Sequence, residues 1–264
     1  MRTMIGVTIL AASGAVAACP PRILTDTTFL NSDWTGQVVY DSTRTQNASF
    51  TAFQTVYDGA HGPSRQTNHS WCGQNVSGSQ GMVVFHRRAA WTHDPSLQGP
   101  VASISYTLDA NAYSAPSTNA VGYGLAIEQN GSVYVNSGVA FHGAGWTTIA
   151  RTGLGPVNFG RVSGPGPATP DFSAAGSPMT FGYYTSNGTG YDGCFGTSSV
   201  ADNLALTITP CAADVNCDGS IDDFDYFDFL NAFFADSMAA DFNGDTSVDD
   251  FDYFDFLNAF FGGC

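Results

Sequence analysis

The chain has 264 residues and a formal net charge of −15. This length allows one substantial hydrophobic core and a small second one. The acidic balance argues against nucleic acid as a partner, because binding a phosphate backbone requires basic patches. The charge is unevenly placed, since residues 212–264 hold 13 of the 23 acidic residues and no basic residue. A step of this kind indicates two modules with different roles.

Residues 1–18 have the features of an export signal. Arg2 precedes a short apolar stretch from Met4 to Val16, and Ala15–Ala17 matches a cleavage site. The stretch is too short for a transmembrane helix. Two processing patterns overlap here. Ordinary cleavage would release a secreted, extracellular protein, whereas the sequence VAAC ending at Cys19 also resembles a lipoprotein signal that would place a lipid on that cysteine.

The cysteines fit an oxidising location, and disulfides are their expected state. None has the C-x-x-C spacing of a zinc or redox site. A lipid on Cys19 would leave an odd number of thiols, and connectivity stays open. The six cysteines are at positions 19, 72, 194, 211, 217 and 264.

Residues 19–210 are predicted to form an antiparallel β-sandwich of the jelly-roll type, so the fold class is mainly β. The segment 124–135 alternates apolar and polar residues around Asn130–Gly131, a pair that accepts the positive φ angles of a hairpin turn. The Gly-, Pro- and Ser-rich stretch 161–178 is predicted to be a loop. Other predicted strands are short, β-branched or aromatic, and they cover 36–41, 49–58, 81–88, 101–110, 145–150, 179–185 and 203–209.

Residues 211–264 are predicted to form a small α-helical calcium-binding domain built from a repeat. The segment DVNCDGSIDDFD at 214–225 aligns with DFNGDTSVDDFD at 241–252, and YFDFLNAFF follows both. Each offers oxygen ligands at positions 1, 3, 5, 7, 9 and 12 of a twelve-residue loop, which suits a cation that prefers six to eight oxygens. The predicted Ca²⁺ ligands are Asp214, Asn216, Asp218, the Ser220 carbonyl, Asp222 and Asp225 in loop 1, and Asp241, Asn243, Asp245, the Ser247 carbonyl, Asp249 and Asp252 in loop 2.

Position 6 distinguishes the two loops. It is Gly219 in loop 1 and Thr246 in loop 2. This position makes a sharp turn that Gly tolerates and a β-branched residue resists. We therefore expect two Ca²⁺ sites, of which the second is weaker.

A helix is predicted after each loop, with an aromatic arc broader than one helix contact needs. Either the sister helix and the β-domain cover that arc, or it is a partner-binding face. Residues 211–264 resemble a type I-like dockerin, the paired loop–helix module that docks enzymes to cohesin domains in cellulosomes. The resemblance implies the ligands above and a cohesin-like or other protein domain as partner of helices 224–234 and 251–261.

The chain departs from the dockerin pattern in two ways. Phe224 and Phe251 stand where polar recognition residues are common, and the helices lack basic residues. Phe-rich repeats ending in Gly–Cys resemble the C-terminal modules of planctomycete-type secreted proteins. By this resemblance Cys264 is expected to pair with Cys211 or Cys217 and to join the two ends of the module.

The β-domain shows no strong catalytic motif. Glycoside hydrolysis needs paired carboxyl groups, and Glu128 is the only Glu. His86 and His93, with Arg87 and Arg88 nearby, are either catalytic or, the favoured interpretation, ordinary strand and loop residues. Trp34, Trp71, Trp91 and Trp146 either stack on sugar rings or, the favoured interpretation for each, pack in the core.

The segments TDTTFLNSDW (25–34) and VADNLALTIT (200–209) weakly resemble the first and last strands of jelly-roll carbohydrate-binding or laminin-G-like domains. By that resemblance Asp202–Asn203 is a minor candidate for a structural Ca²⁺. Two functions follow. One is a secreted, non-catalytic carbohydrate- or surface-binding protein with a calcium-stabilised dockerin-like tail. The alternative is a glycoside hydrolase or accessory protein of polysaccharide catabolism, since dockerins usually accompany such enzymes.

Overall fold

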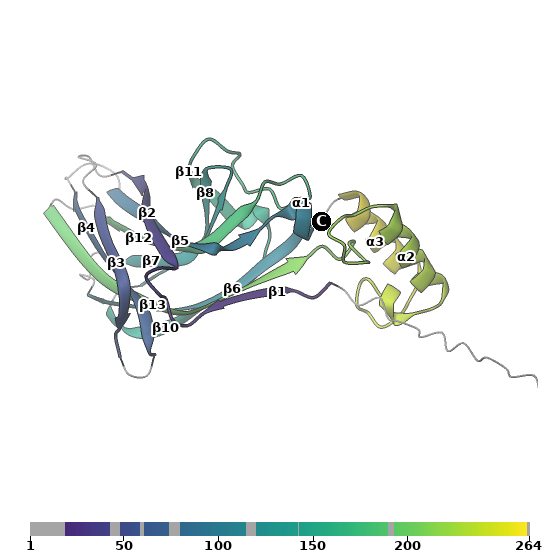
Figure 1. Ribbon diagram of the computed structural model, residues 1–264, viewed down its shortest axis with the longest axis horizontal. Helices are drawn as coiled ribbons and strands as arrows, with labels where there is room; N and C mark the ends of the chain where they lie inside the picture. The colour runs from purple at the N-terminus through teal and green to yellow at the C-terminus, as the bar shows by residue number, and fades with distance from the viewer. Residues whose placement is uncertain are drawn as a thin grey trace, which may run out of the picture.

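The computed structural model describes residues 19–42, 48–58, 61–73, 80–114, 120–141, 143–189 and 193–262, and Figure 1 shows their arrangement. Two antiparallel sheets pack face to face around one large core, as predicted. Sheet A has the order β10 (Gly143–Leu154), β6 (Val101–Ser114), β13 (Gly193–Pro210), β4 (Pro63–Gly73) and β3 (Ser49–Val56), and β1 (Arg22–Asp26) also pairs with β13. Sheet B has the order β11 (Phe159–Ser163), β8 (Ser132–Asn136), β7 (Val121–Gln129), β12 (Met179–Thr189), β5 (Gln80–His93) and β2 (Trp34–Asp41), and β9 (Val139–Phe141) also pairs with β7.

The predicted hairpin is confirmed. Strands β7 and β8 pair on either side of Asn130 and Gly131, which both have positive φ angles, 49° and 71°. Each of the other predicted strand segments lies largely or wholly in a strand of the structure. Strands β9 and β11 were not predicted, and neither was β4. The reason is that the buried side chains of β4 include polar ones, Arg65, Thr67 and His69, so the strand lacks an apolar face.

The loop predicted at residues 161–178 is shorter than expected. Strand β11 reaches Ser163, and its residues pair with β8. Apart from this end, the part up to Pro178 contains no helix or strand.

Sheet B curls so strongly that its terminal strands, β11 and β2, contact each other. The curled face encloses a small second core made by Phe85, Ala126, Val133 and Tyr184, with several valines packed around it. Phe85 therefore points away from the large core, while His86 beside it points inward, as alternation along a strand requires.

The C-terminal segment forms two helices, α2 (Asp223–Phe234) and α3 (Asp250–Gly262), with the short 3₁₀ turn η2 (Met238–Ala240) between them. Phe229 and Phe256 hold the helices together, since both are buried and their rings stack with centroids 4.0 Å apart and planes 2° from parallel. Burying each ring contributes about 1.5–3 kcal/mol. The hydroxyls of Tyr226 and Tyr253 are 3.2 Å apart. Matching residues of the two repeats thus meet across an approximate two-fold axis.

The idea that the sister helix and the β-domain cover the whole aromatic arc is wrong. Six Phe side chains remain more than half exposed, and corresponding residues have nearly equal exposure in the two repeats. We call these six side chains the exposed Phe surface of the tail. Their exposed fractions are 70% for Phe224, 58% for Phe227, 78% for Phe234, 70% for Phe251, 57% for Phe254 and 79% for Phe261.

The tail begins directly after β13 and lies beyond the end of the sandwich that carries α1 (Pro95–Gln98), as Figure 1 shows. The amide of Cys211 donates to the carbonyl of Pro100 at 3.0 Å. A Cβ atom added to Gly219 would lie 3.1 Å from the backbone nitrogen of Gly99, so the backbone of loop 1 sits directly on the sandwich. No helix among the described residues is both long and apolar enough to cross a membrane.

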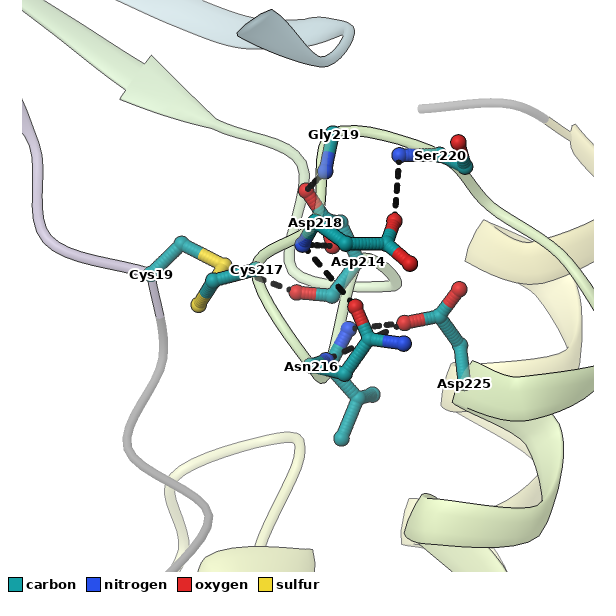
Figure 2. Close-up of a disulfide and its surroundings, with 9 residues drawn as sticks. Cys19, Asp214, Asn216, Cys217, Asp218, Gly219, Ser220 and Asp225 are labelled. Carbon is teal, nitrogen blue, oxygen red and sulfur yellow. Dashed lines mark hydrogen bonds between the residues drawn. A yellow bond between two sulfur atoms is a disulfide. The ribbon is translucent and has the colours of Figure 1, made fainter.

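Two disulfides join residues far apart in sequence. Cys72 and Cys194 link adjacent strands of sheet A, and Cys19 and Cys217 link the N-terminal end of the described chain to loop 1 (Figure 2). The Cys19–Cys217 bond bears on two expectations. A sulfur in a disulfide carries no lipid, so the lipoprotein alternative at Cys19 is inconsistent with the structure. Of the two partners expected for Cys264, Cys217 is excluded, and Cys211, which is itself disulfide-bonded, is left. The export signal and Cys264 itself lie outside the described residues. Both disulfides fit an oxidising compartment.

Candidate functional site

Loop 1 is a tightly bonded turn built from the residues predicted to hold Ca²⁺ (Figure 2). The Asp214 carboxylate accepts hydrogen bonds from the amides of Asp218 and Gly219, both at 3.1 Å. Asp225, the last residue of the loop and fully buried, accepts from the amides of Val215 and Asn216. The carboxylates therefore face inward from both ends of the loop.

Loop 2 repeats this arrangement 27 residues later. Asp241 accepts from the amides of Asp245 and Thr246, and buried Asp252 accepts from those of Phe242 and Asn243. At position 9 of each loop an Asp also caps the following helix. Asp222 accepts from Phe224, and Asp249 accepts from Phe251, each at 2.9 Å. These caps explain why α2 and α3 begin where they do.

The chemistry of the loops fits a hard divalent cation. The predicted ligands supply only oxygen, and no Lys, Arg or His occurs in residues 212–264 to neutralise them. Burial raises the pKa of Asp214, and repulsion from the charges of Asp225 and Asp218 acts in the same direction. Nevertheless, no group of three or more His, Cys, Asp or Glu side chains converges closely enough to hold a metal in the part of the chain that the structure describes. Calcium binding remains a proposal.

Each loop carries two residues with positive φ angles, at positions 4 and 6. In loop 1 these are Cys217 (62°) and Gly219 (90°), and in loop 2 they are Gly244 (76°) and Thr246 (73°). The expectation from the sequence concerned position 6 alone. Thr246 at that position does adopt the left-handed conformation, which β-branched residues disfavour. Loop 1, however, has a non-glycine residue of its own in that conformation at position 4.

The β-domain places most of its tryptophans in the core, as the favoured interpretation held. Trp34, Trp71 and Trp91 are 1–4% exposed. Trp146 is half-buried, its ring stacks on His61 with centroids 4.0 Å apart, and its Nε1 donates to Asp58 at 2.6 Å. None of the three core rings is open to a sugar.

His86, His93 and Asp202 of the β-domain are separate buried features, whereas Asn203 is exposed. His86 lies inside the sandwich and shares a hydrogen bond with Thr185 at 3.0 Å, whereas the Nε2 of His93 bonds the carbonyl of Gly99 at 2.8 Å. Asp202 is fully buried on sheet A, and burial raises its pKa to about 6. Asn203 adopts a positive φ of 50° and donates to Asp109. Among the described residues, no contact brings these groups together as a catalytic set.

The curled face of sheet B, which is turned away from the large core, carries a feature that the sequence did not predict. Arg87 on β5 forms an ion pair with Glu128 on β7, reaching across β12, and the side chains of Arg87 and Glu128 are 35% and 24% exposed. The guanidinium carbon of Arg87 lies 5.9 Å from the centre of the Phe85 ring. A hollow of about 280 Å³ opens here, and it is lined by Thr35, Gly36, Gln37, Phe85 and Arg87.

A second hollow lies further along the same strands. Its volume is about 290 Å³, and Tyr40, Ser42, Val83 and Ser186 are among the residues that line it. The strand register joins the two hollows, since Thr35 pairs with Arg87, Gln37 with Phe85, and Tyr40 with Val83. We call the combined surface the sheet B groove. No signal in the sequence predicts it, because the lone Glu128 gains its meaning only from strands that pair across β12.

Comparisons with known proteins give a likeness of fold. No protein-family model matches the chain, and no curated protein matches it. Among solved structures, the family 11 carbohydrate-binding module from Clostridium thermocellum, solved with a β-1,3-1,4-mixed-linked tetrasaccharide, is 13% identical with a TM-score of 0.38, over 70% of this chain and 94% of that one.

Two further structures are similar in the same way. The CBM22-1 xylan-binding domain from Paenibacillus barcinonensis is 13% identical with a TM-score of 0.34, over 74% of this chain and 99% of that one. TmCBM27, a mannan-recognising module, is 10% identical with a TM-score of 0.34, over 71% and 98%. Likeness at this level carries no argument about a ligand, which the site itself has to supply.

Proposed function

We propose that the protein is a secreted, non-catalytic polysaccharide-binding protein and that the sheet B groove holds the sugar chain. The observation that carries this proposal is the row of groups along paired strands β2 and β5. It combines amide, hydroxyl and guanidinium groups with the exposed ring of Tyr40. Sugar hydroxyls need such paired donors and acceptors, and the apolar faces of sugar rings pack on aromatic surfaces.

The Arg87–Glu128 pair suits this role better than an acid–base role. The ion pair fixes the carboxylate as a hydrogen-bond acceptor in the groove, while Arg87 keeps further N–H groups to donate. A glycoside hydrolase needs a second carboxyl group placed across the scissile bond. We therefore favour binding over hydrolysis for this groove.

The test is a binding screen of the whole secreted chain against soluble polysaccharides by native affinity electrophoresis, followed by titration calorimetry on each hit. We expect Arg87→Ala to lower affinity at least tenfold, because it removes charge-assisted hydrogen bonds and leaves Glu128 without its partner. Arg151→Ala, on sheet A, is the matched control and should bind normally. Binding that Arg87→Ala leaves unchanged would place the site elsewhere. A reducing-end assay on the same polysaccharides tests the hydrolase alternative.

We also propose that the tail binds two Ca²⁺ ions and attaches the protein to a partner protein through the exposed Phe surface. The duplicated loop geometry supports the first part. The exposure of six Phe rings, matched between the two repeats, supports the second, because monomeric soluble proteins rarely expose large apolar patches without a binding role. A cohesin-like domain is one such partner. Calorimetric titration of chelator-treated protein with Ca²⁺ tests the first part, and Asp225→Ala and Asp252→Ala should each remove one site.

A further inference from the structure

The exposed Phe surface of the tail is divided between two helices that lie side by side (Figure 1). Phe229 of α2 stacks on Phe256 of α3, so each helix turns the side with this ring towards its sister. Successive residues of an α-helix are about 100° apart around its axis, so Phe227 points about 160° away from Phe229, and Phe224 and Phe234 about 140° away. The exposed rings of α3 repeat these offsets around Phe256, because its sequence repeats that of α2. The two halves of the surface therefore face in opposite directions.

The exposed residues of each helix have the spacing of a coiled-coil seam. In such a seam the contact residues recur at i, i+3, i+7 and i+10, which are the a and d positions of a heptad repeat. In α2 these positions hold four exposed residues, Phe224, Phe227, Asn231 and Phe234. In α3 they hold the matching four, Phe251, Phe254, Asn258 and Phe261. We call these two sets the outer stripes.

The outer stripes take no part in the core of the tail. That core is centred on the Phe229–Phe256 stack, and no residue of either stripe belongs to its hydrophobic cluster in the described part of the chain. The water-facing side of a helix is ordinarily polar, whereas three of the four positions in each stripe are Phe. An open seam of this composition indicates a binding site for another helix.

Charges beside the stripes decide which helix fits. The e and g positions flank the a and d positions, and ion pairs there set the choice of partner. Asp223 and Asp228 take these positions in α2, Asp250 and Asp255 take them in α3, and all are exposed. Residues 212–264 hold no Lys, Arg or His, and the charge of two bound Ca²⁺ ions would not cancel their 13 carboxylates. A second copy of the chain would therefore set Asp against Asp, whereas a basic helix would form ion pairs with them.

We propose that each outer stripe binds an amphipathic helix of a partner protein, with apolar residues at its a and d positions and Lys or Arg at its e and g positions, and that one tail binds two such helices at once. The proposal rests on the attachment role given above to the exposed Phe surface, and it supplies the chemistry of the partner. Basic side chains of that helix pair with the Asp carboxylates and lie over the Phe rings. Asn231 and Asn258 fix the register, because a buried Asn needs a polar partner. Both stripes are filled together because they face in opposite directions.

Titration calorimetry of the full chain with two synthetic peptides, in the presence of Ca²⁺, tests this proposal. Both peptides are about 21 residues long and have Leu at a and d, but one has Lys and the other has Glu at e and g. We expect two Lys peptides to bind per chain and the Glu peptide to bind at least about tenfold more weakly. Phe227→Ala and Phe254→Ala should each leave one site for the Lys peptide, and together they should leave none. Phe53→Ala, which removes an exposed ring of sheet A, should keep both sites.

Several outcomes would overturn the proposal. They are one Lys peptide per chain, equal binding of the two peptides, and no binding of either. Self-association of the chain alone in sedimentation equilibrium, or flotation with phosphatidylcholine–phosphatidylglycerol vesicles, would overturn it too if the double variant abolished that behaviour, and would assign the stripes to a second copy or to a membrane.

The attachment role is tested apart from the peptides, by retention of the protein on the cells that secrete it. If replacing all six exposed Phe residues with Ser releases the protein while neither peptide binds, attachment through the Phe surface holds and the basic helical partner is wrong. If the replacement leaves retention unchanged, the attachment role itself is wrong.

Discussion

Replacing Thr246 with glycine should tighten the second calcium site. Thr246 sits at φ 73°, in the left-handed region, where an ordinary residue costs about 1–2 kcal/mol. Glycine removes that strain, but the greater conformational freedom of glycine in the unfolded chain offsets about 0.5–1 kcal/mol of the gain. Thr246 is exposed, so the substitution sacrifices no packing. The net gain is about 0.5–1 kcal/mol, which corresponds to a roughly two- to fivefold higher affinity of loop 2 for Ca²⁺.

The control for this prediction lies in the same loop. Gly244 has φ 76°, and a Cβ atom added there meets no atom within 4 Å, so Gly244→Thr introduces backbone strain without a clash at Cβ. Competition with a fluorescent calcium chelator measures the affinity of both variants. Thr246→Gly should bind more tightly than wild type and Gly244→Thr more weakly. Equal affinities in two folded variants would show that strain at these positions does not limit calcium binding.

Three further predictions concern stability. Cys19→Ser with Cys217→Ser should lower the free energy of unfolding by about 2–5 kcal/mol in denaturant titrations, because the bond closes a loop with a sequence separation of 198 residues; unchanged stability would contradict this. Phe229→Ala should lower the free energy of unfolding by about 3–5 kcal/mol, and substitution of the exposed Phe227 by Ala should lower it far less. Similar losses for the two variants in urea titrations would mean that the Phe229–Phe256 stack is not the centre of the tail's core. Burial lowers the pKa of His69 from 6.5 to about 4. As the pH falls below 6.5, His69 is therefore protonated in the unfolded chain before it is protonated in the folded chain. The free energy of unfolding, fully present above pH 6.5, falls by roughly 3 kcal/mol as the pH drops to 4. Urea titrations of wild type and His69→Gln at pH 7 and 4.5 check this, and parallel losses in both proteins would refute it.

The sequence predicted well those features in which the interacting groups are close along the chain. The Asn130–Gly131 hairpin and the helices after each loop follow from local rules about turns and capping. The loop hydrogen bonds also connect residues at most 10 positions apart, so spacing alone indicated their arrangement.

Features that depend on pairing between distant strands were not predictable in this way. Strand β4 was missed because Arg65, Thr67 and His69 fill the interior positions where apolar residues mark a strand. The ion pair of Arg87 and Glu128 depends on β12 lying between their strands, an order that the sequence does not state. The sheet B groove could not be predicted from the sequence for the same reason.

The Cys19–Cys217 bond changes the physical basis for ranking the two calcium loops. From the sequence, loop 2 is weaker because Thr246 replaces Gly219. In the structure each loop holds one non-glycine residue at positive φ, Cys217 in loop 1 and Thr246 in loop 2, so backbone strain alone does not rank them. What distinguishes loop 1 is that Cys217 is tied to Cys19 and that Gly219 sits against Gly99. The tie limits the conformations open to loop 1 before any cation binds, which favours binding by preorganisation. The stronger first site is therefore expected only in the oxidised protein, and in the doubly serine-substituted protein the two sites should approach equal affinity.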